Sequence, residues 1–104
     1  MQRIAFTMKL FKGCKEEYKK RHDELWDDMR LLLKEKGVSD FSIFLDEDSS
    51  MLFAFLVAED PSALMDLPDH PVQKKWWKYM KDIMQTNADN SPFTIDLKEV
   101  FYLP

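Results

Sequence analysis

The chain has 104 residues, of which 45% are hydrophobic and 33% charged, and 15 basic against 19 acidic side chains give a net charge of −4. This length fits one compact domain over residues 1–104, and two glycines without a low-complexity tract argue against a disordered or linker protein. Because the acidic and basic residues are interspersed and no basic stripe occurs, the chain is not expected to bind nucleic acid.

The hydrophobic segments and the cysteine content indicate where the protein resides. The longest apolar run, residues 51–58, is well short of the roughly 20 residues that a membrane-spanning helix needs. The first residues lack the apolar stretch of a signal peptide, and the single cysteine, Cys14, cannot form an internal disulfide. We therefore expect a cytoplasmic protein without a membrane partner, and we interpret Cys14 as incidental to function.

The first third of the chain predicts a strand followed by one long helix. Apolar and polar residues alternate from Ile4 to Leu10, as in a half-buried strand, and Gly13 ends this pattern. Apolar residues then recur at helical spacing, which predicts a helix over Glu16–Lys36. Gly37 stands where a glycine commonly follows a helix.

The middle of the chain predicts a hairpin of two strands around a polar loop at residues 46–50. The first strand places Phe41, Ile43 and Leu45 on one face. The second, over residues 51–58, is apolar on both faces, which is typical of a central strand.

The last third predicts a short turn, a helix and a final strand. Asp60-Pro61-Ser62 is an entry signal for a helical turn, the apolar spacing predicts a helix over Val72–Met84, and residues 94–103 alternate again. The resulting order, βαββαβ, is the ferredoxin-like arrangement, an α+β fold with helices on one face of a four-stranded antiparallel sheet.

Such a sheet leaves its other face without a covering layer. With 13% aromatic residues and a strand that is apolar on both faces, this open face would be a large hydrophobic patch. We expect two copies to close face to face as a homodimer, a dimeric α/β barrel.

His22 is the first candidate for chemistry. It lies four residues after Tyr18 and four before Trp26, so the predicted helix would carry all three on one inward face. Two interpretations stay open: a hydrogen-bonded core residue, or a general acid/base, because imidazole is half-ionised near neutral pH. The adjacent Asp23 points about 100° away around the helix and is not expected to orient His22.

The tryptophan pair Trp76-Trp77 is the second candidate. Adjacent helical residues point in different directions, so one core stripe does not readily take both rings. Trp76 fits the stripe of Val72 and Met80, whereas Trp77 lies on a flank with Gln73. The pair is either part of a wide core or a partly open aromatic wall, which would suit the C–H face of a sugar ring.

No residues have the spacing of a metal or nucleotide site. His22 and His70 are far apart, and the chain has no Cys-x-x-Cys or His-x-x-x-His sequence. Gly13 and Gly37 alone cannot form a glycine-rich phosphate loop. We therefore expect neither a metal nor a nucleotide cofactor.

Several blocks of residues form one pattern that extends from Arg3 to the last residue. The first half of the chain contributes Glu16-Glu17-Tyr18, Arg21-His22, Trp26, Leu45-Asp46 and Leu52-Phe53-Ala54. The second half contributes the more specific blocks, which are Gln73, Trp76-Trp77-Lys78-Tyr79-Met80, Asp82, Met84, Asn87-Ala88-Asp89-Asn90-Ser91-Pro92 and Glu99-Val100-Phe101-Tyr102-Leu103-Pro104. This pattern resembles the L-rhamnose mutarotase family.

The resemblance implies a cytoplasmic, cofactor-free homodimer, an isomerase that interconverts the α and β pyranose anomers of L-rhamnose. It implies that His22 is the proton donor and that Tyr18, Phe41, Trp76 and Trp77 contact the sugar. The family commonly has tyrosine where this chain has Phe41, so the ring is kept here and a hydroxyl is lost.

Two alternative functions stay open beside this one. A dimeric α/β-barrel monooxygenase shares the architecture and would bind haem or oxidise a quinol-like substrate. A non-catalytic domain that binds a small ligand would lose only stability on replacement of His22.

Overall fold

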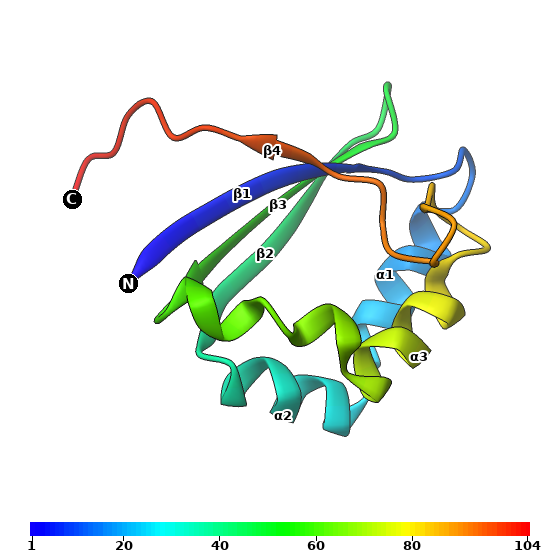
Figure 1. Ribbon diagram of the computed structural model, residues 1–104. Coiled ribbons are helices and arrows are strands. Elements are labelled where there is room, and N and C mark those ends of the chain that lie inside the picture. Colours follow the sequence, from blue (N-terminus) through cyan, green and yellow to red (C-terminus); the bar gives the residue numbers. More distant parts are fainter.

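Four strands form one antiparallel sheet, and the helices all lie on the same side of it (Figure 1). The computed structural model describes residues 1–104, and the order of strands across the sheet is β2-β3-β1-β4. The elements are β1 (Gln2–Lys9), α1 (Lys15–Asp23), α2 (Asp27–Glu35), β2 (Val38–Asp46), β3 (Met51–Ala58), the 3₁₀ turns η1 (Pro61–Leu64) and η2 (Leu67–Asp69), α3 (Pro71–Met80) and β4 (Ile95–Leu97). The predicted ferredoxin-like α+β fold is confirmed.

The central position predicted for residues 51–58 is confirmed, because β3 pairs with β1 on one side and β2 on the other. Leu52, Ala54 and Leu56 are buried, and Leu52 and Ala54 join the main core. Met8, opposite Leu52 in β1, belongs to the same core. Alternate residues of both strands therefore form the floor on which the helices pack.

The single helix predicted over Glu16–Lys36 is wrong, because the chain forms α1 and α2 with a break between Asp23 and Asp27. Trp26 has an extended backbone, with φ −58° and ψ 139°. This break lets Leu25 and Trp26, adjacent in sequence, both pack against the core. As a consequence, Trp26 does not share a helix face with His22, although its ring remains close to the same residues.

Gly37 follows α2 as predicted, and its backbone requires glycine. Its φ is +81°, in the left-handed region, and a Cβ added there would lie 3.0 Å from the Cβ of Glu59. The Gly37 amide bonds to the carbonyl of Lys34, which closes the last turn of the helix.

The second predicted helix is four residues too long. α3 ends at Met80, and the following residues form turns that bring Met84 into an isolated bridge with Leu10 beyond the end of β1. Ile83 and Met84 remain buried, so their apolar character serves the core rather than a longer helix. The turn predicted at Asp60 is confirmed, since its carboxylate accepts a hydrogen bond from the amide of Ser62 at the start of η1.

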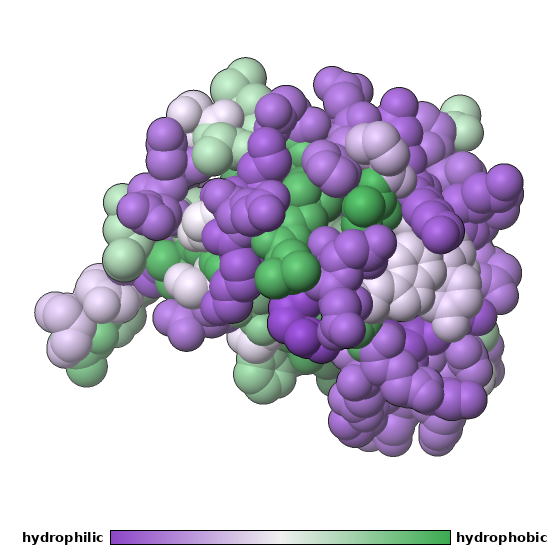
Figure 2. Space-filling model, turned by 90° about the horizontal axis from the view of Figure 1, so that it is seen from below, coloured by the Kyte–Doolittle hydropathy of each residue, from purple (hydrophilic) through white to green (hydrophobic).

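The strand predicted over residues 94–103 is also too long, because β4 covers Ile95–Leu97 alone. The rest of the chain leaves the sheet, and its end projects from the body in Figures 1 and 2. The side chains of Val100, Phe101 and Leu103 are 78–89% exposed. The alternating pattern in this segment marks residues suited to burial, but this chain alone offers no surface on which they could be buried.

The two faces of the sheet differ in cover. The side that carries the helices presents a largely hydrophilic surface around a smaller hydrophobic area (Figure 2). On the other side, Phe44, Phe53, Ile95 and Leu97 are exposed, and Phe44 pairs with Phe53 across neighbouring strands. None of the helices combines the length and apolar composition needed to cross a membrane.

Candidate active site

A cavity of about 930 Å³ lies between the sheet and the helices. Twenty of its 28 lining residues are hydrophobic, so the uncharged polar groups inside it are few. The lining includes all five residues that the sequence singled out, and they come from three different elements, α1, β2 and α3: Tyr18, His22, Phe41, Trp76 and Trp77. The fold therefore brings together residues that are up to 59 positions apart in the chain (77 − 18).

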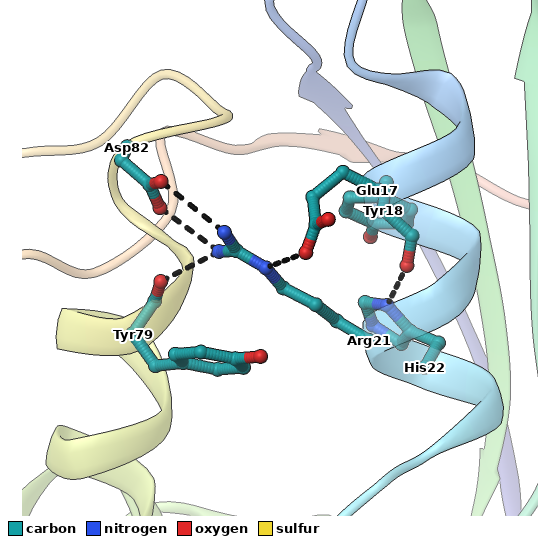
Figure 3. Close-up of polar contacts among 6 residues, drawn as sticks. All are labelled: Glu17, Tyr18, Arg21, His22, Tyr79 and Asp82. Carbon is teal, nitrogen blue, oxygen red and sulfur yellow. Dashed lines mark hydrogen bonds and ion pairs between the residues drawn. The ribbon is translucent and has the colours of Figure 1, made fainter.

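The backbone of α1 fixes the orientation of the His22 imidazole. Its Nδ1 atom lies 3.0 Å from the carbonyl oxygen of Tyr18, one helical turn earlier (Figure 3). A carbonyl oxygen can only accept, so Nδ1 carries the proton in the neutral imidazole. Nε2 then holds a free lone pair, and no protein group binds it. His22 can therefore accept a proton at Nε2.

Burial lowers the pKa of His22 below its ordinary value of 6.5, although the hydrogen bond to the Tyr18 carbonyl and the negative charge of Asp23 oppose this shift. Asp23 itself is bound by Lys19, one turn earlier on α1. The expectation that Asp23 does not orient the imidazole is therefore consistent with the geometry. At neutral pH the imidazole is uncharged and can act as a base.

Aromatic rings pack against His22 on two sides. The ring of Tyr18 is stacked on it, with centroids 4.3 Å apart, and Trp76 meets it edge-on at 5.4 Å. Trp26 in turn contacts Trp76 at 5.0 Å, again edge-on. These contacts restrict the imidazole to one orientation and surround it with apolar surface.

The hydroxyl of Tyr18 is a second polar group at the cavity. The residue is buried, and burial raises the pKa of the phenol far above its ordinary value of 10. The hydroxyl makes no hydrogen bond to another protein group but retains contact with solvent. Tyr18 therefore remains a neutral phenol that can donate a hydrogen bond to a bound molecule.

Arg21 ties the helix that carries His22 to the end of α3. Its guanidinium binds the carboxylates of Glu17 and Asp82 and donates to the carbonyl oxygen of Tyr79 at 2.7 Å (Figure 3). It also lies over the ring of Tyr79, 4.4 Å from the centroid. Since the Arg21 side chain is only 10% exposed, this contact fixes α1 against α3, and the hydrogen bond from Arg21 lowers the pKa of Asp82.

Phe41 reaches the cavity from the opposite side, on β2. The pairing of β2 with β3 shifts register between Ser39 and Ser42, and Asp40 has a φ of +50°. Phe41 lies within this irregularity, and the residue is 40% exposed. The ring is therefore partly open to solvent at the edge of the cavity.

The sequence interpretation named three further residues near the site without assigning them a role in it. Trp26 packs against Trp76 from the break between α1 and α2, and Asp82 reaches Arg21 across 61 positions of sequence. The third, Gln73, lines the cavity one turn before the tryptophans, where its spacing to Trp76 was a signal. No group of three or more His, Cys, Asp or Glu side chains is arranged to hold a metal ion.

Comparisons with known proteins identify the family of the chain. The family model described as L-rhamnose mutarotase matches residues 3–103. The chain is 54% identical to an L-rhamnose mutarotase of Brucella anthropi, covering 99% of this chain and 97% of that protein, and 52% identical to one of Listeria monocytogenes, covering 99% of both. The crystal structure of the L-rhamnose mutarotase of Formosa agariphila matches all of both chains with a TM-score of 0.94 and 51% identity. The chain belongs to the L-rhamnose mutarotase family.

Proposed function

We propose that this protein is an L-rhamnose mutarotase, which interconverts the α and β pyranose anomers by opening and closing the sugar ring. The observation that carries the proposal is the neutral His22, whose Nε2 lone pair is left free at an otherwise largely apolar cavity. The membership of the chain in the family, over residues 3–103, supports the choice of sugar.

In the proposed reaction, His22 moves one proton between two oxygens of the same carbon. Nε2 takes the proton of the C1 hydroxyl and delivers it to the ring oxygen, while the C1–O5 bond breaks and the C1–O1 bond becomes a carbonyl. The aldehyde rotates about the C1–C2 bond, and the reverse transfer closes the ring on its other face. One positioned acid/base supplies roughly 10²–10⁴ in rate, or about 3–5 kcal/mol of barrier.

The other proposed roles follow from the chemistry of each side chain. The neutral phenol of Tyr18 would donate a hydrogen bond to a sugar oxygen. Trp76, Trp77 and Phe41 would offer apolar faces to the C–H groups of the ring and to its methyl group. All of these groups belong to the protein, so the reaction needs no cofactor.

The test is NMR saturation transfer between the two anomeric protons of L-rhamnose, with and without substoichiometric protein. Faster exchange with protein is expected, and exchange at the rate seen in buffer alone contradicts the proposal. As a second test, dialysis of the protein against a chelator is expected to leave the rate of anomer exchange unchanged. Loss of the rate with recovery on addition of Zn²⁺ or Mn²⁺ would contradict the cofactor-free mechanism.

We also propose a cytoplasmic homodimer whose subunits pack through the open faces of their sheets. Its support is the exposed aromatic surface of Phe44 and Phe53, together with the apolar residues of the projecting tail, Val100 and Phe101. Burial of such surface stabilises an assembly by roughly 25 cal/mol per Å² of apolar area. The cytoplasmic location proposed here is supported by the family resemblance.

Light scattering coupled to size-exclusion chromatography tests the dimer. The wild-type protein should have twice the mass of one chain, and Phe53→Asp should shift it towards one chain, since a charge would then face the partner sheet. Lys81→Asp, on the exposed turn after α3, is the control and should leave the mass unchanged. A wild-type mass of one chain would contradict this part of the proposal.

A further inference from the structure

Gln73 is an uncharged polar residue to which the proposed mechanism assigns no role. It lies on α3, three residues before Trp76 and four before Trp77, so the three side chains occupy neighbouring positions on the helix surface. The residue is only 7% exposed, and it lines the cavity together with both tryptophans.

The amide of Gln73 has no partner within the protein. No hydrogen bond joins it to another residue, yet neither of its polar atoms is fully sealed from solvent. The amide can therefore form hydrogen bonds with water or with a molecule bound in the cavity. An apolar residue of the same size would fill this position equally well if packing were its only role, so the amide is available to bind a molecule in the cavity.

We infer that Gln73 is a positioning residue that binds a sugar hydroxyl away from C1, an inference that rests on the proposed mutarotase function. A glutamine amide donates through Nε2 and accepts through Oε1, so it can serve one hydroxyl as donor and its neighbour as acceptor. Its place beside the tryptophans complements them, because they cover the apolar face of the ring and leave the hydroxyls at the rim to be bound.

This role predicts a change in affinity rather than in chemistry. Gln73 makes no hydrogen bond to His22 and carries no proton that titrates near neutral pH. Its loss should therefore raise KM about tenfold, which corresponds to about 1.4 kcal/mol, and leave kcat within threefold.

The experiment measures KM and kcat for L-rhamnose anomer exchange in the full chain, with Gln73→Met as the near-isosteric apolar variant. Gln73→Leu removes the same amide with a different shape and carries the test if Gln73→Met does not fold. Gln85→Met, at an exposed glutamine that does not line the cavity, is the matched control and should change neither constant. Urea unfolding without sugar should show that Gln73→Met is at least as stable as the wild type.

Analogues of L-rhamnose that lack the hydroxyl at C2, C3 or C4 then identify the contact. Removing the hydroxyl that Gln73 binds should raise KM for the wild type and have little further effect in Gln73→Met. An unchanged KM in the variant, a fall in kcat and stability together, or equal effects of all three analogues in both proteins would overturn the inference. Absence of exchange in the wild type would instead overturn the proposed function, and the inference with it.

Discussion

The Nδ1 atom of His22 is hydrogen-bonded to the carbonyl oxygen of Tyr18 at 3.0 Å, while the rings of the same two residues are stacked 4.3 Å apart. One residue thus fixes the imidazole twice, through its backbone and through its side chain. Many enzymes orient a histidine with a carboxylate, which raises the basicity of the imidazole. Here a neutral carbonyl takes that place, and burial keeps the pKa of His22 low.

The pH dependence of the exchange rate should reflect this low pKa. Because Nε2 must be unprotonated to accept the C1 proton, the enzymatic rate should stay high as the pH falls through 6.5, the ordinary pKa of imidazole, and reach half its maximum at a lower pH. Anomer exchange measured from pH 4.5 to 8, after subtraction of the rate in buffer, checks this. A half-maximal rate above pH 6.5 would contradict it.

The same shift affects stability with a definite sign. As the pH falls below 6.5, the unfolded chain takes up a proton on residue 22 before the folded chain does, so this residue's contribution is complete above pH 6.5 and declines below it. The free energy of unfolding should therefore fall more between pH 7 and pH 5.5 in the wild type than in His22→Gln. Equal losses in both proteins would show that residue 22 is not responsible.

The variant His22→Ala should lower the exchange rate at least tenfold and leave the protein folded, since the loss of one acid/base removes roughly 10²–10⁴ in rate. The other histidine offers a matched control. His70 lies outside the cavity and caps α3 by accepting a hydrogen bond from the Val72 amide, so His70→Ala should cost on the order of 1 kcal/mol of stability but no activity. A folded His22→Ala variant with undiminished exchange would remove His22 from the mechanism.

Phe41→Tyr should strengthen the binding of L-rhamnose. Phe41 lines the cavity and is partly exposed, so a phenol in its place could reach both a sugar hydroxyl and solvent. A hydrogen bond of this kind contributes on the order of 1 kcal/mol, which lowers the half-saturating concentration several-fold. The maximal rate should stay within about threefold. Saturation curves distinguish this from a hundredfold rise in maximal rate, which would mean that the phenol takes part in proton transfer.

Arg21→Lys should destabilise the fold, although the charge is kept. An ammonium group cannot bind Glu17, Asp82 and the Tyr79 carbonyl in the planar arrangement of the guanidinium. Since both carboxylates are well exposed to solvent, we expect a loss of only about 1–2 kcal/mol in the free energy of unfolding.

Urea denaturation checks this, with Lys19→Ala as the control. Lys19 pairs with Asp23 on the exposed surface of α1. Loss of this pair should lower the free energy of unfolding by no more than about 0.5 kcal/mol. Equal losses in the two variants would mean that Arg21 contributes no more than a surface ion pair.

Periodicity was enough to predict the first three strands and the face of the sheet that their residues occupy, because alternation is a local property. It was not enough at the break between α1 and α2, where the apolar spacing continues through an extended Trp26. The signal there was electrostatic. Basic residues close the last turn of α1 and the acidic pair Asp27-Asp28 opens α2, as the helix dipole favours.

The candidate site likewise contains residues that the sequence predicted and contacts that it did not. His22 and the tryptophan pair stood out as chemically unusual residues at helical positions, and the cavity includes them all. The contact of Arg21 with Asp82 could not be predicted, because it depends on how α1 packs against the end of α3 rather than on any spacing. The apolar alternation of residues 98–103 predicted a strand that does not form, for a related reason. Alternation shows that these residues are suited to burial, but it does not show which surface would bury them.

The cavity is enclosed by elements of a single chain, on the opposite side of the sheet from the exposed phenylalanines. Two copies joined through those phenylalanines would therefore have complete and separate sites, facing away from each other. Saturation with L-rhamnose should then be hyperbolic, with a Hill coefficient of about one. A mixed dimer of one wild-type and one His22→Ala subunit should retain half of the activity, because each subunit would act independently of the other.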